Sequence, residues 1–364
     1  RQEVEANKDL LSRNITNKNV LITGAGGSIG SEISRQVTKN NPKKVILLDS
    51  NEYALYSIKN EIEGISTNAE VFSILGNVTN KKRMLDVLDT FNIDTVYHAA
   101  AYKHVPLVEE NPFEAVFNNI IGTKISAESA LEASVETFVL ISTDKAVRPT
   151  NIMGATKRFA ELILQSMSKG SKTKMSMVRF GNVMGSSGSA VPLFQQQIKE
   201  GGPVTVTHPE VTRYFMSIPE AAELVIQAGA MGQGGDVFVL DMGEPVKIVD
   251  LVKRLISLSG KEIIDDYNQD GDIEIKFTGL RPGEKLYEEL LIGDNVSTTE
   301  HARILKAKED NLTKEELHDC LVNIERAEQD GNVDLLKESL KEAVVGFSPD
   351  KANADIIYLK KNSK

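Results

Sequence analysis

Residues 19–30 read NVLITGAGGSIG, and this stretch decides the fold class of the chain. Its first five residues form a short run of aliphatic and β-branched side chains, which is typical of a buried strand. A glycine-rich turn follows, and helical spacing then continues as far as Val37. Strand, glycine turn and helix in this order are typical of the first half of a βαβ unit.

The glycine turn itself predicts a bound dinucleotide. Glycines adopt left-handed backbone conformations and let the chain pass close to a pyrophosphate. The pyrophosphate then lies at the start of the helix, where backbone N–H groups have no intrahelical partner. The expected contacts are Gly24, Gly27, Ser28, Ile29 and Gly30.

The next predicted strand indicates which dinucleotide binds. The run Lys44–Leu48 ends at Asp49, about 20 residues beyond the glycine turn, where an acidic side chain can bind the adenosine ribose hydroxyls. Ser50 and Asn51 follow, without an arginine that would favour a 2′-phosphate. The sequence therefore predicts NAD rather than NADP, and a helix-capping Asp49 is the alternative.

Strand and helix patterns then alternate as far as Phe180. We expect strands at 71–74, 94–98, 137–141 and 175–180, with helices at 81–90, 112–133 and 153–168. Strands separated by helices of about ten or more residues predict an α/β fold with a doubly wound parallel sheet. Strand-end residues expected beside the cofactor are Asn77, Val78, Ala99, Ala100 and Ala101.

A polar cluster follows the expected strand 137–141. Residues 141–158 read ISTDKAVRPTNIMGATKR, so Thr143, Asp144 and Lys145 should lie where a strand leaves the sheet. In open α/β sheets this carboxyl end is where ligands and chemistry gather. A polar loop that caps the strand, with Asp144 paired to Arg148, fits the same residues.

Composition excludes several function classes. The 364 residues carry a net charge of −10 and a pI near 5.2, which argues against nucleic acid as the main partner. One cysteine, Cys320, excludes an internal disulfide, and five scattered histidines offer no metal-ligand spacing. We therefore expect no metal and a reducing, cytoplasmic environment. No apolar run approaches the roughly 18 to 20 residues of a membrane span.

Several motifs together carry a family resemblance. TGxxGxxG at Thr23–Gly30, NIIGT at 119–123, and Lys157 four residues after Met153 resemble the extended short-chain dehydrogenase/reductases. AYKHVP at 101–106, STDK at 142–145, RFGNV at 179–183 and GLRPGEK at 279–285 narrow the resemblance. They look like the UDP-N-acetylglucosamine 4,6-dehydratases of bacterial polysaccharide and glycoprotein-sugar biosynthesis, over roughly residues 9 to 300.

The resemblance implies a redox-neutral reaction on a UDP-sugar. Hydride passes from sugar C4 to the nicotinamide, and the resulting ketone acidifies the proton on C5. A base removes that proton, an acid helps the C6 hydroxyl leave as water, and the hydride returns to C6. NAD is regenerated in each turnover, so we expect it to stay tightly bound.

The resemblance also implies residue roles. Thr143 positions or relays the C4 hydroxyl proton, Asp144 is the acid at C6, and Lys145 is the base at C5. For these roles the pKa of Lys145 must fall from about 10.4 and that of Asp144 must rise from about 3.9. Burial shifts both pKa values in the required directions, whereas the mutual attraction of the two groups opposes the shifts.

Two residues on the next expected helix complete this set. Met153 stands where most of the superfamily has a tyrosine, and it cannot ionise. Lys157 resembles the lysine that binds the nicotinamide ribose, with an ordinary surface lysine as the alternative. Asn119 is implied as a further cofactor contact.

Beyond the sixth strand the sequence changes character, and a smaller substrate domain is expected. The predicted division is a lead-in at 1–18, an NAD-binding domain at 19–181 with 217–243 returning to it, substrate-binding segments at 182–216 and 244–300, and a helical extension at 301–364. By resemblance, the diphosphate is held by Asn182, Arg213 and Arg281, and the uracil lies beside Val191 and Pro192. Lys103 and His104 are further expected substrate contacts, and a surface ion pair with Glu210 is the alternative for Arg213.

Further expectations concern stereochemistry, assembly and attachment. Residues 25–28 and 102–107 look more like the larger, membrane-anchored branch, which retains the configuration at C5. Asp9–Arg13 resembles the lead-in of those members, so the parent protein is expected to carry N-terminal membrane helices.

Helices 112–133 and 153–168 are expected to pair between subunits, giving at least a dimer. The alternatives are a C5-inverting dehydratase, a nucleotide-sugar 4-epimerase, which would ordinarily keep the tyrosine, and a non-catalytic NAD-binding regulator, which predicts a damaged site.

Overall fold

The computed structural model describes residues 6–65, 68–289, 296–349 and 353–362. Within them the main sheet has nine strands in the order β15-β16-β11-β6-β5-β4-β1-β2-β3. The strands from β3 to β11 along this order are parallel to their neighbours, whereas β16 and β15 are added antiparallel at one edge. The strands are β1 (Asn19–Thr23), β2 (Lys44–Asp49), β3 (Glu70–Leu75), β4 (Thr95–His98), β5 (Thr137–Ile141), β6 (Lys174–Arg179), β11 (Asp236–Leu240), β15 (Val296–Thr298) and β16 (Ile304–Ala307).

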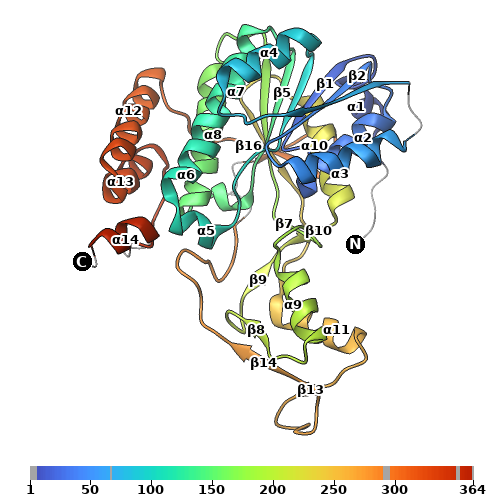
Figure 1. The fold of residues 1–364 in the computed structure, drawn as a ribbon, viewed down its shortest axis with the longest axis vertical. Coiled ribbons are helices and arrows are strands. Elements are labelled where there is room, and N and C mark those ends of the chain that lie inside the picture. The colour runs from blue at the N-terminus through green and yellow to red at the C-terminus, as the bar shows by residue number, and fades with distance from the viewer. Residues whose placement is uncertain (1–5, 66–67, 290–295, 350–352, 363–364) are drawn as a thin grey trace.

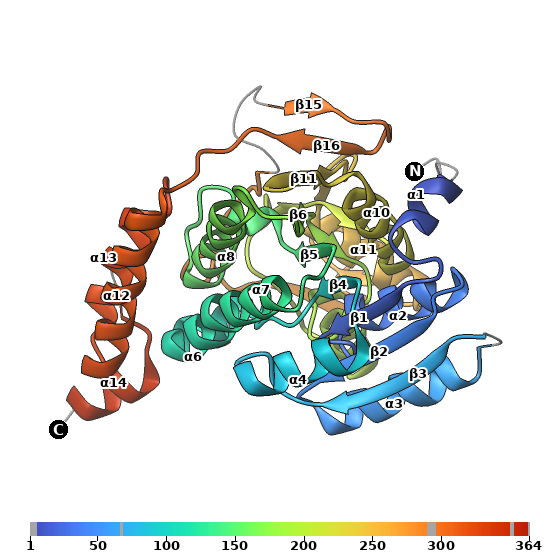
Figure 2. The ribbon, with the colours of Figure 1, turned by 90° about the horizontal axis from the view of Figure 1, so that it is seen from above.

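Helices cover both faces of this sheet (Figures 1 and 2), which confirms the predicted doubly wound α/β fold. One face packs against α1 (Lys8–Arg13), α2 (Ser28–Lys39), α3 (Glu52–Glu63) and α10 (Ile218–Met231). The other packs against α4 (Lys81–Phe91), α6 (Pro112–Val116), α7 (Gly122–Glu132) and α8 (Ile152–Ser168). Side chains alternate between the two cores, as a strand requires: Val20 and Ile22 of β1 lie in one and Leu21 in the other.

The expected helix 112–133 is continuous but not uniform. A π-helical turn, Phe117–Ile121, joins α6 to α7. Such turns occur mostly as single insertions within α-helices and frequently at functional sites. Here the turn contains Asn119, which is buried.

A smaller body projects from the carboxyl ends of the strands, at the bottom of Figure 1. It has its own apolar core, which includes Phe194, Val204, Val252 and Ile273. Its elements are β7 (Asn182–Val183), α9 (Ala190–Lys199), β8 (Val204–Val206), β9 (Thr212–Arg213), β10 (Phe215–Met216), β12 (Val246–Lys247), α11 (Ile248–Leu258), β13 (Ile263–Ile264) and β14 (Ile273–Phe277). The short helix α5 (Val105–Glu110) lies on the main body near the junction.

The last part of the chain differs from the expected helical extension. Residues 304–307, expected to be helical, form β16, which joins the main sheet through β11. The expected helices do follow as α12 (Lys314–Asp330) and α13 (Val333–Ala343), with α14 (Ile356–Asn362) after them. Apolar residues of α12 and α13 share one core with α8, whose side chains are buried from Ile152 to Ser166. Within a single chain, therefore, α8 is already covered.

Candidate active site

The glycine turn forms a tight cradle at the end of β1. Gly24 has a φ of +64°, and a Cβ on it would lie 2.7 Å from the backbone nitrogen of Ala100. A Cβ on Gly30 would lie 2.0 Å from the carbonyl oxygen of Gly24. Helix α2 begins directly after this turn, and its N-cap residue, Gly27, provides no side-chain hydrogen bond. The first N–H groups of α2 therefore have no side-chain cap, which is the arrangement that suits a pyrophosphate.

Asp49 lies beside this cradle at the end of β2. Its Oδ2 accepts a hydrogen bond from the Gly26 N–H at 2.9 Å, and its Oδ1 accepts one from the Asn51 N–H at 2.8 Å. The two backbone donors orient the carboxylate, and each oxygen keeps lone-pair capacity for a ligand. Asn51, not Asp49, is the N-cap of α3, so the capping alternative for Asp49 is wrong.

Hydrogen bonds between polar residues connect the carboxyl ends of β1 and β4 with the helical segment 117–132. His98 of β4 is buried between the hydroxyls of Thr23 and Thr123, at 2.8 Å and 3.2 Å. Burial, and to a smaller degree Lys157, lowers the pKa of His98 to about 3, so this ring is neutral at physiological pH. Asn119 accepts from the Tyr102 N–H at 2.8 Å and donates to the Tyr102 carbonyl at 2.9 Å. Asn119 therefore fixes the chain just after the predicted cofactor contacts Ala99–Ala101.

The other predicted cofactor residue pair, at the end of β3, has its own local structure. The side chain of Asn77 accepts from both the N–H and the hydroxyl of Thr79, each at 2.9 Å. Val78 is buried in the core against Gly122. Their contact with a cofactor remains a prediction.

Thr143, Asp144 and Lys145 meet at the carboxyl end of β5, where a short 3₁₀ helix, η2 (Asp144–Ala146), begins. The Thr143 hydroxyl donates to Asp144 Oδ1 at 2.9 Å, and Lys145 Nζ donates to the same oxygen at 3.1 Å. Lys145 Nζ also donates to Asn182 Oδ1 at 3.3 Å. Asp144 thus pairs with Lys145, whereas Arg148 pairs with Glu289.

A second carboxylate, which the sequence analysis did not identify, completes this cluster. Glu288 is buried, and its Oε1 lies 3.6 Å from Lys145 Nζ and 3.8 Å from Arg213 Nε. Burial lowers the pKa of Lys145, but Asp144 and Glu288 outweigh this effect and raise it above the ordinary value. The shift is opposite in sign to the one that burial alone would cause, because Asp144, and after it Glu288, face the ammonium group.

Met153 and Lys157 lie on the first two turns of α8. Met153 is packed in the main core at 3% exposure. Lys157 is also buried, so an ordinary surface lysine is ruled out, and its Nζ donates to the Ile141 carbonyl at 2.7 Å. Burial lowers the pKa of Lys157 to about 8, against an opposing effect of Glu161.

A buried charge network lies behind the carboxyl end of β5. Glu161 of α8 accepts from the Ser142 hydroxyl at 2.7 Å and from Arg179 Nε at 2.8 Å. Burial raises the pKa of Glu161, but Arg179 and Arg158 outweigh it and hold the value at about 2. Both arginines also pair with Glu309, from the segment between β16 and α12. The C-terminal part of the chain therefore contacts the back of the active-site loop.

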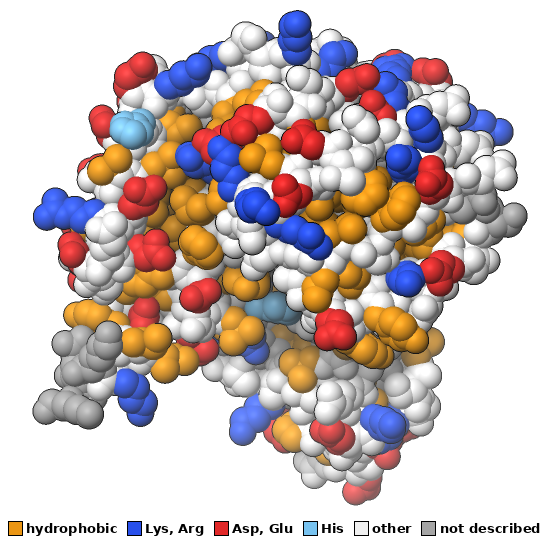
Figure 3. All heavy atoms as spheres, turned by 45° about the horizontal axis from the view of Figure 1, so that its top comes forward, with side chains coloured by type: hydrophobic (Ala, Val, Ile, Leu, Met, Phe, Trp, Pro, Cys, Tyr) orange, Lys and Arg blue, Asp and Glu red, His pale blue; other side chains and the backbone are white. Residues whose placement is uncertain are grey.

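The predicted substrate residues come from both sides of the junction. A Cβ on Gly188 would lie 2.3 Å from the ring of His104, so His104 contacts the loop of the smaller body. Val191 is buried at the start of α9, whereas Lys103, Pro192 and Arg281 are exposed. A space-filling view shows the surface hollowed between the two bodies (Figure 3). Contacts of these residues with a substrate remain predictions.

Arg213 has a different local setting from the one expected. Its guanidinium donates to the carbonyls of Thr212, Lys285 and Leu286 and to Glu284, at 2.7 to 3.3 Å. Glu210 pairs with Lys247 instead. Arg213 therefore holds the 284–288 segment in place, and a contact with a diphosphate would add to these bonds.

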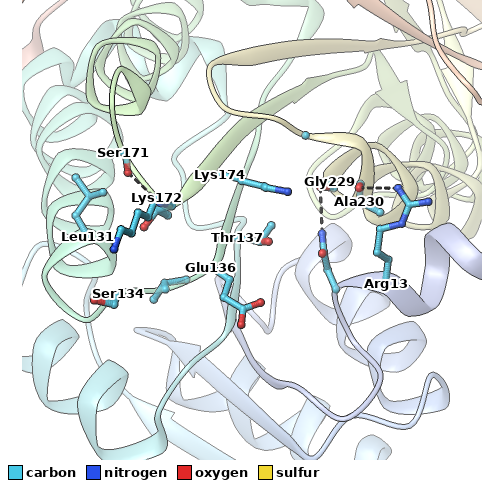
Figure 4. A pocket seen from close by; sticks show the side chains of 14 residues that line it. Arg13, Leu131, Ser134, Glu136, Thr137, Ser171, Lys172, Lys174, Gly229 and Ala230 are labelled. Carbon is cyan, nitrogen blue, oxygen red and sulfur yellow. Dashed lines mark hydrogen bonds between the residues drawn. The ribbon is translucent and has the colours of Figure 1, made fainter.

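A cavity of about 670 Å³ lies away from this cluster, at the amino ends of β5 and β6 (Figure 4). At one side of it, Arg13 and Asn14 donate to the carbonyls of Ala230 and Gly229. It lies at the opposite end of these strands from Asp144 and Lys145. Among the described residues, no group of three or more His, Cys, Asp and Glu side chains is placed to bind a metal ion.

Comparison with known proteins establishes the family. Residues 20–309 match the sequence pattern of the polysaccharide biosynthesis protein family. The chain belongs to this family. It is 57% identical over 320 residues to the capsular polysaccharide biosynthesis protein CapD of Staphylococcus aureus, and the match covers 87% of this chain and 52% of CapD. The chain thus spans about half the length of this family member.

Solved structures share the fold of this chain. Pen from Bacillus thuringiensis is 35% identical, with a TM-score of 0.72 over 85% of this chain and 98% of that one. Two structures with bound NAD show the shared fold alone. They are the dTDP-glucose 4,6-dehydratase DesIV from Streptomyces venezuelae (20% identity, TM-score 0.65, 75% and 88% covered) and a UDP-glucose 4-epimerase from Stenotrophomonas maltophila (18%, 0.61, 74% and 88%). None of the helices in the described ranges is long and apolar enough to span a membrane.

Proposed function

We propose that this protein catalyses the NAD-dependent 4,6-dehydration of UDP-N-acetylglucosamine in bacterial surface polysaccharide or glycan biosynthesis. The product would be UDP-2-acetamido-2,6-dideoxy-4-keto-hexose with the C5 configuration retained. The observation that carries the proposal is the Asp144–Lys145 acid/base pair, 3.1 Å apart at the end of β5. An epimerase needs no such pair and would ordinarily keep a tyrosine where this chain has Met153.

The residues at the glycine turn fit NAD. The cradle at Gly24 and Gly30 leaves no room for side chains, α2 has no side-chain cap, and the carboxylate of Asp49 is already oriented. These features would hold a pyrophosphate and a ribose. Lys157, with its lowered pKa, lies in the second turn of α8, the helix that follows the cluster, and would contact the nicotinamide ribose. When bound, NAD supplies the redox chemistry at C4 and C6 of the sugar.

The acid and the base can arise from one proton transfer within the pair. The raised pKa of Lys145 favours an ammonium beside the Asp144 carboxylate in the free enzyme. Moving one proton across the 3.1 Å contact gives a neutral carboxylic acid and a neutral amine, with no change in the number of bound protons. Exclusion of water favours this neutral pair, because burial disfavours the charged form of both groups. Asp144 could then protonate the leaving C6 hydroxyl, and Lys145 could accept the C5 proton.

Retention at C5 follows if Lys145 serves as the only base there. Lys145 is held in place by Asp144 and Asn182, so it would take and return the proton on one face of the sugar. The test is to run the reaction in heavy water and identify the product by NMR. We expect one deuterium at C5 with the D-configuration. An L-configured product would indicate the inverting dehydratase, and a C4 epimer that still carries its C6 hydroxyl would indicate the epimerase.

The proposal also covers membrane attachment and oligomeric state. The chain spans about half of CapD, and we expect the complete protein to be attached to the inner membrane by preceding helices, with this part in the cytoplasm. We also expect at least a homodimer. Because α8 is covered by α12 and α13 of the same chain, the expected pairing would have to use other surfaces. Light scattering of the purified chain tests the dimer, and a monomer at working concentration would contradict it.

A further inference from the structure

Glu288 enters the catalytic cluster from a segment remote in sequence. The segment 279–289 follows β14 of the smaller body and returns to the junction. There the Gly283 carbonyl accepts from the Thr150 hydroxyl at 2.8 Å and from Asn151 Nδ2 at 3.1 Å. Lys285 Nζ donates to the Val147 carbonyl at 3.0 Å. The segment is thus fastened to the loop that follows Lys145, which fixes the position of Glu288.

The cluster combines two carboxylates with two cations. Asp144 and Glu288 both contact Lys145 Nζ, at 3.1 Å and 3.6 Å, and Glu288 also faces Arg213. The side chains of Asp144 and Glu288 are 1% and 4% exposed. One oxygen of each, Asp144 Oδ2 and Glu288 Oε2, is buried without a hydrogen-bond partner within the described ranges. Buried acceptors are rarely left unpaired, so both open oxygens point to donors that a ligand would bring.

We propose that Glu288 is a positioning residue for Lys145, and that its carboxylate stabilises the ammonium group formed when Lys145 accepts the C5 proton. This inference rests on the proposed function. In the elimination step the C5–H bond breaks and the proton passes to Lys145 Nζ. The electron pair of that bond forms the C5–C6 double bond as the C6–O bond breaks. The proton of Asp144 joins the departing hydroxyl to give water.

The charges on the cluster explain why a second carboxylate matters in that step. Before elimination Lys145 is neutral, so the Glu288 carboxylate does not stabilise the amine that lies 3.6 Å away. After elimination Lys145 is an ammonium, and Glu288 attracts it in a site from which water is largely excluded. An interaction that is stronger after the proton has moved lowers the barrier to moving it. The first step, oxidation at C4, changes no charge on Lys145 and should depend on Glu288 much less.

The test compares these two steps in a single turnover. Protein loaded with NAD is mixed with UDP-N-acetylglucosamine in heavy water. The absorbance of reduced nicotinamide reports oxidation at C4, and mass spectrometry reports deuterium at C5. For Glu288→Gln we expect slower deuterium incorporation, on the order of 100-fold, while reduced nicotinamide still forms and now accumulates. Glu288→Asp keeps the charge and should recover much of the C5 step.

Glu284→Gln is the matched control. Glu284 contacts the same guanidinium, at 3.3 Å from Arg213 Nη2, but its other partners are the Thr207 hydroxyl and the Arg281 N–H rather than Lys145. A residue that merely supports Arg213 should affect both steps together, so this variant should show no accumulation of reduced nicotinamide. Because the two rates are measured on the same molecules, their ratio does not depend on how much of a variant is folded.

The outcomes separate the inference from the proposed function. An unchanged ratio of the two rates in Glu288→Gln, with an active wild-type protein, overturns the role of Glu288 alone. A ratio that changes equally in Glu284→Gln overturns it too, because the effect then acts through Arg213. If the wild-type protein gives neither reduced nicotinamide nor C5 deuterium with this substrate, the proposed function fails and the inference falls with it.

Discussion

Replacing Glu309 by alanine tests how firmly the C-terminal part of the chain is joined to the main body. Glu309 pairs with Arg158 and Arg179, whose side chains are 9% and 1% exposed. Without it, two buried guanidiniums share the single carboxylate of Glu161, and a net positive charge is left inside the protein. Removing one partner from a buried ion pair typically costs about 3–5 kcal/mol. Because the Asp310 carbonyl still accepts from Arg158 at 2.6 Å, we expect the lower end, about 3 kcal/mol.

Urea unfolding at neutral pH measures this change. The midpoint should fall while the slope with denaturant stays the same, since the variant exposes no additional surface. Glu136→Ala is the control, because Glu136 forms an ion pair with Lys18 but is 60% exposed, and its loss should cost less than about 1 kcal/mol. Glu309→Gln keeps a hydrogen-bond acceptor without the charge, so its unfolding midpoint should lie between those of Glu309→Ala and Glu136→Ala. A change in Glu309→Ala no larger than in the control would refute the reasoning, because it would mean that water screens these arginines.

Three further predictions concern the cofactor, acid stability and the C-terminal helices. Asp49→Arg should weaken NAD binding at least about tenfold in calorimetry, because it replaces a carboxylate acceptor by a cation, and an unchanged affinity would place the ribose contact elsewhere. The pKa of Glu161 is about 2 in the folded state, so its stabilising contribution should be complete above pH 4.5 and be lost as the pH falls towards 2. Glu161→Gln should flatten the dependence of the urea midpoint on pH over that range, and equal slopes in both proteins would contradict the assignment. Leu340→Ala in α13 should cost about 2–5 kcal/mol because Leu340 is fully buried, whereas Glu338→Ala on the exposed face should change stability by less than about 0.5 kcal/mol. Similar unfolding midpoints for these two variants would mean that α13 does not pack on the core.

The sequence predicted the fold class because the signals for it are local. The apolar run 19–23, the glycine turn and the start of α2 lie within a few residues of one another, and each has a characteristic pattern. Repeated alternation of strand and helix then leaves few arrangements other than a parallel sheet. The position of residues 143–145 at the end of a strand was predictable for the same reason, since a strand end is visible in the sequence. The strands β15 and β16 were not predicted, because runs of three and four residues are too short to show an alternating pattern.

Only the tertiary structure decided which charged side chains face Lys145 and Arg179. Glu288 lies 143 residues beyond Lys145 in sequence, and Glu309 lies 130 residues beyond Arg179, so no local pattern links them. Electrostatic interactions depend on separation in space and on exposure to water, neither of which periodicity encodes. From the sequence, burial was expected to lower the pKa of Lys145 and the attraction of Asp144 to oppose that shift. In the folded chain Asp144 and, from the 279–289 segment fastened beside the loop after β5, Glu288 together outweigh burial and raise this pKa.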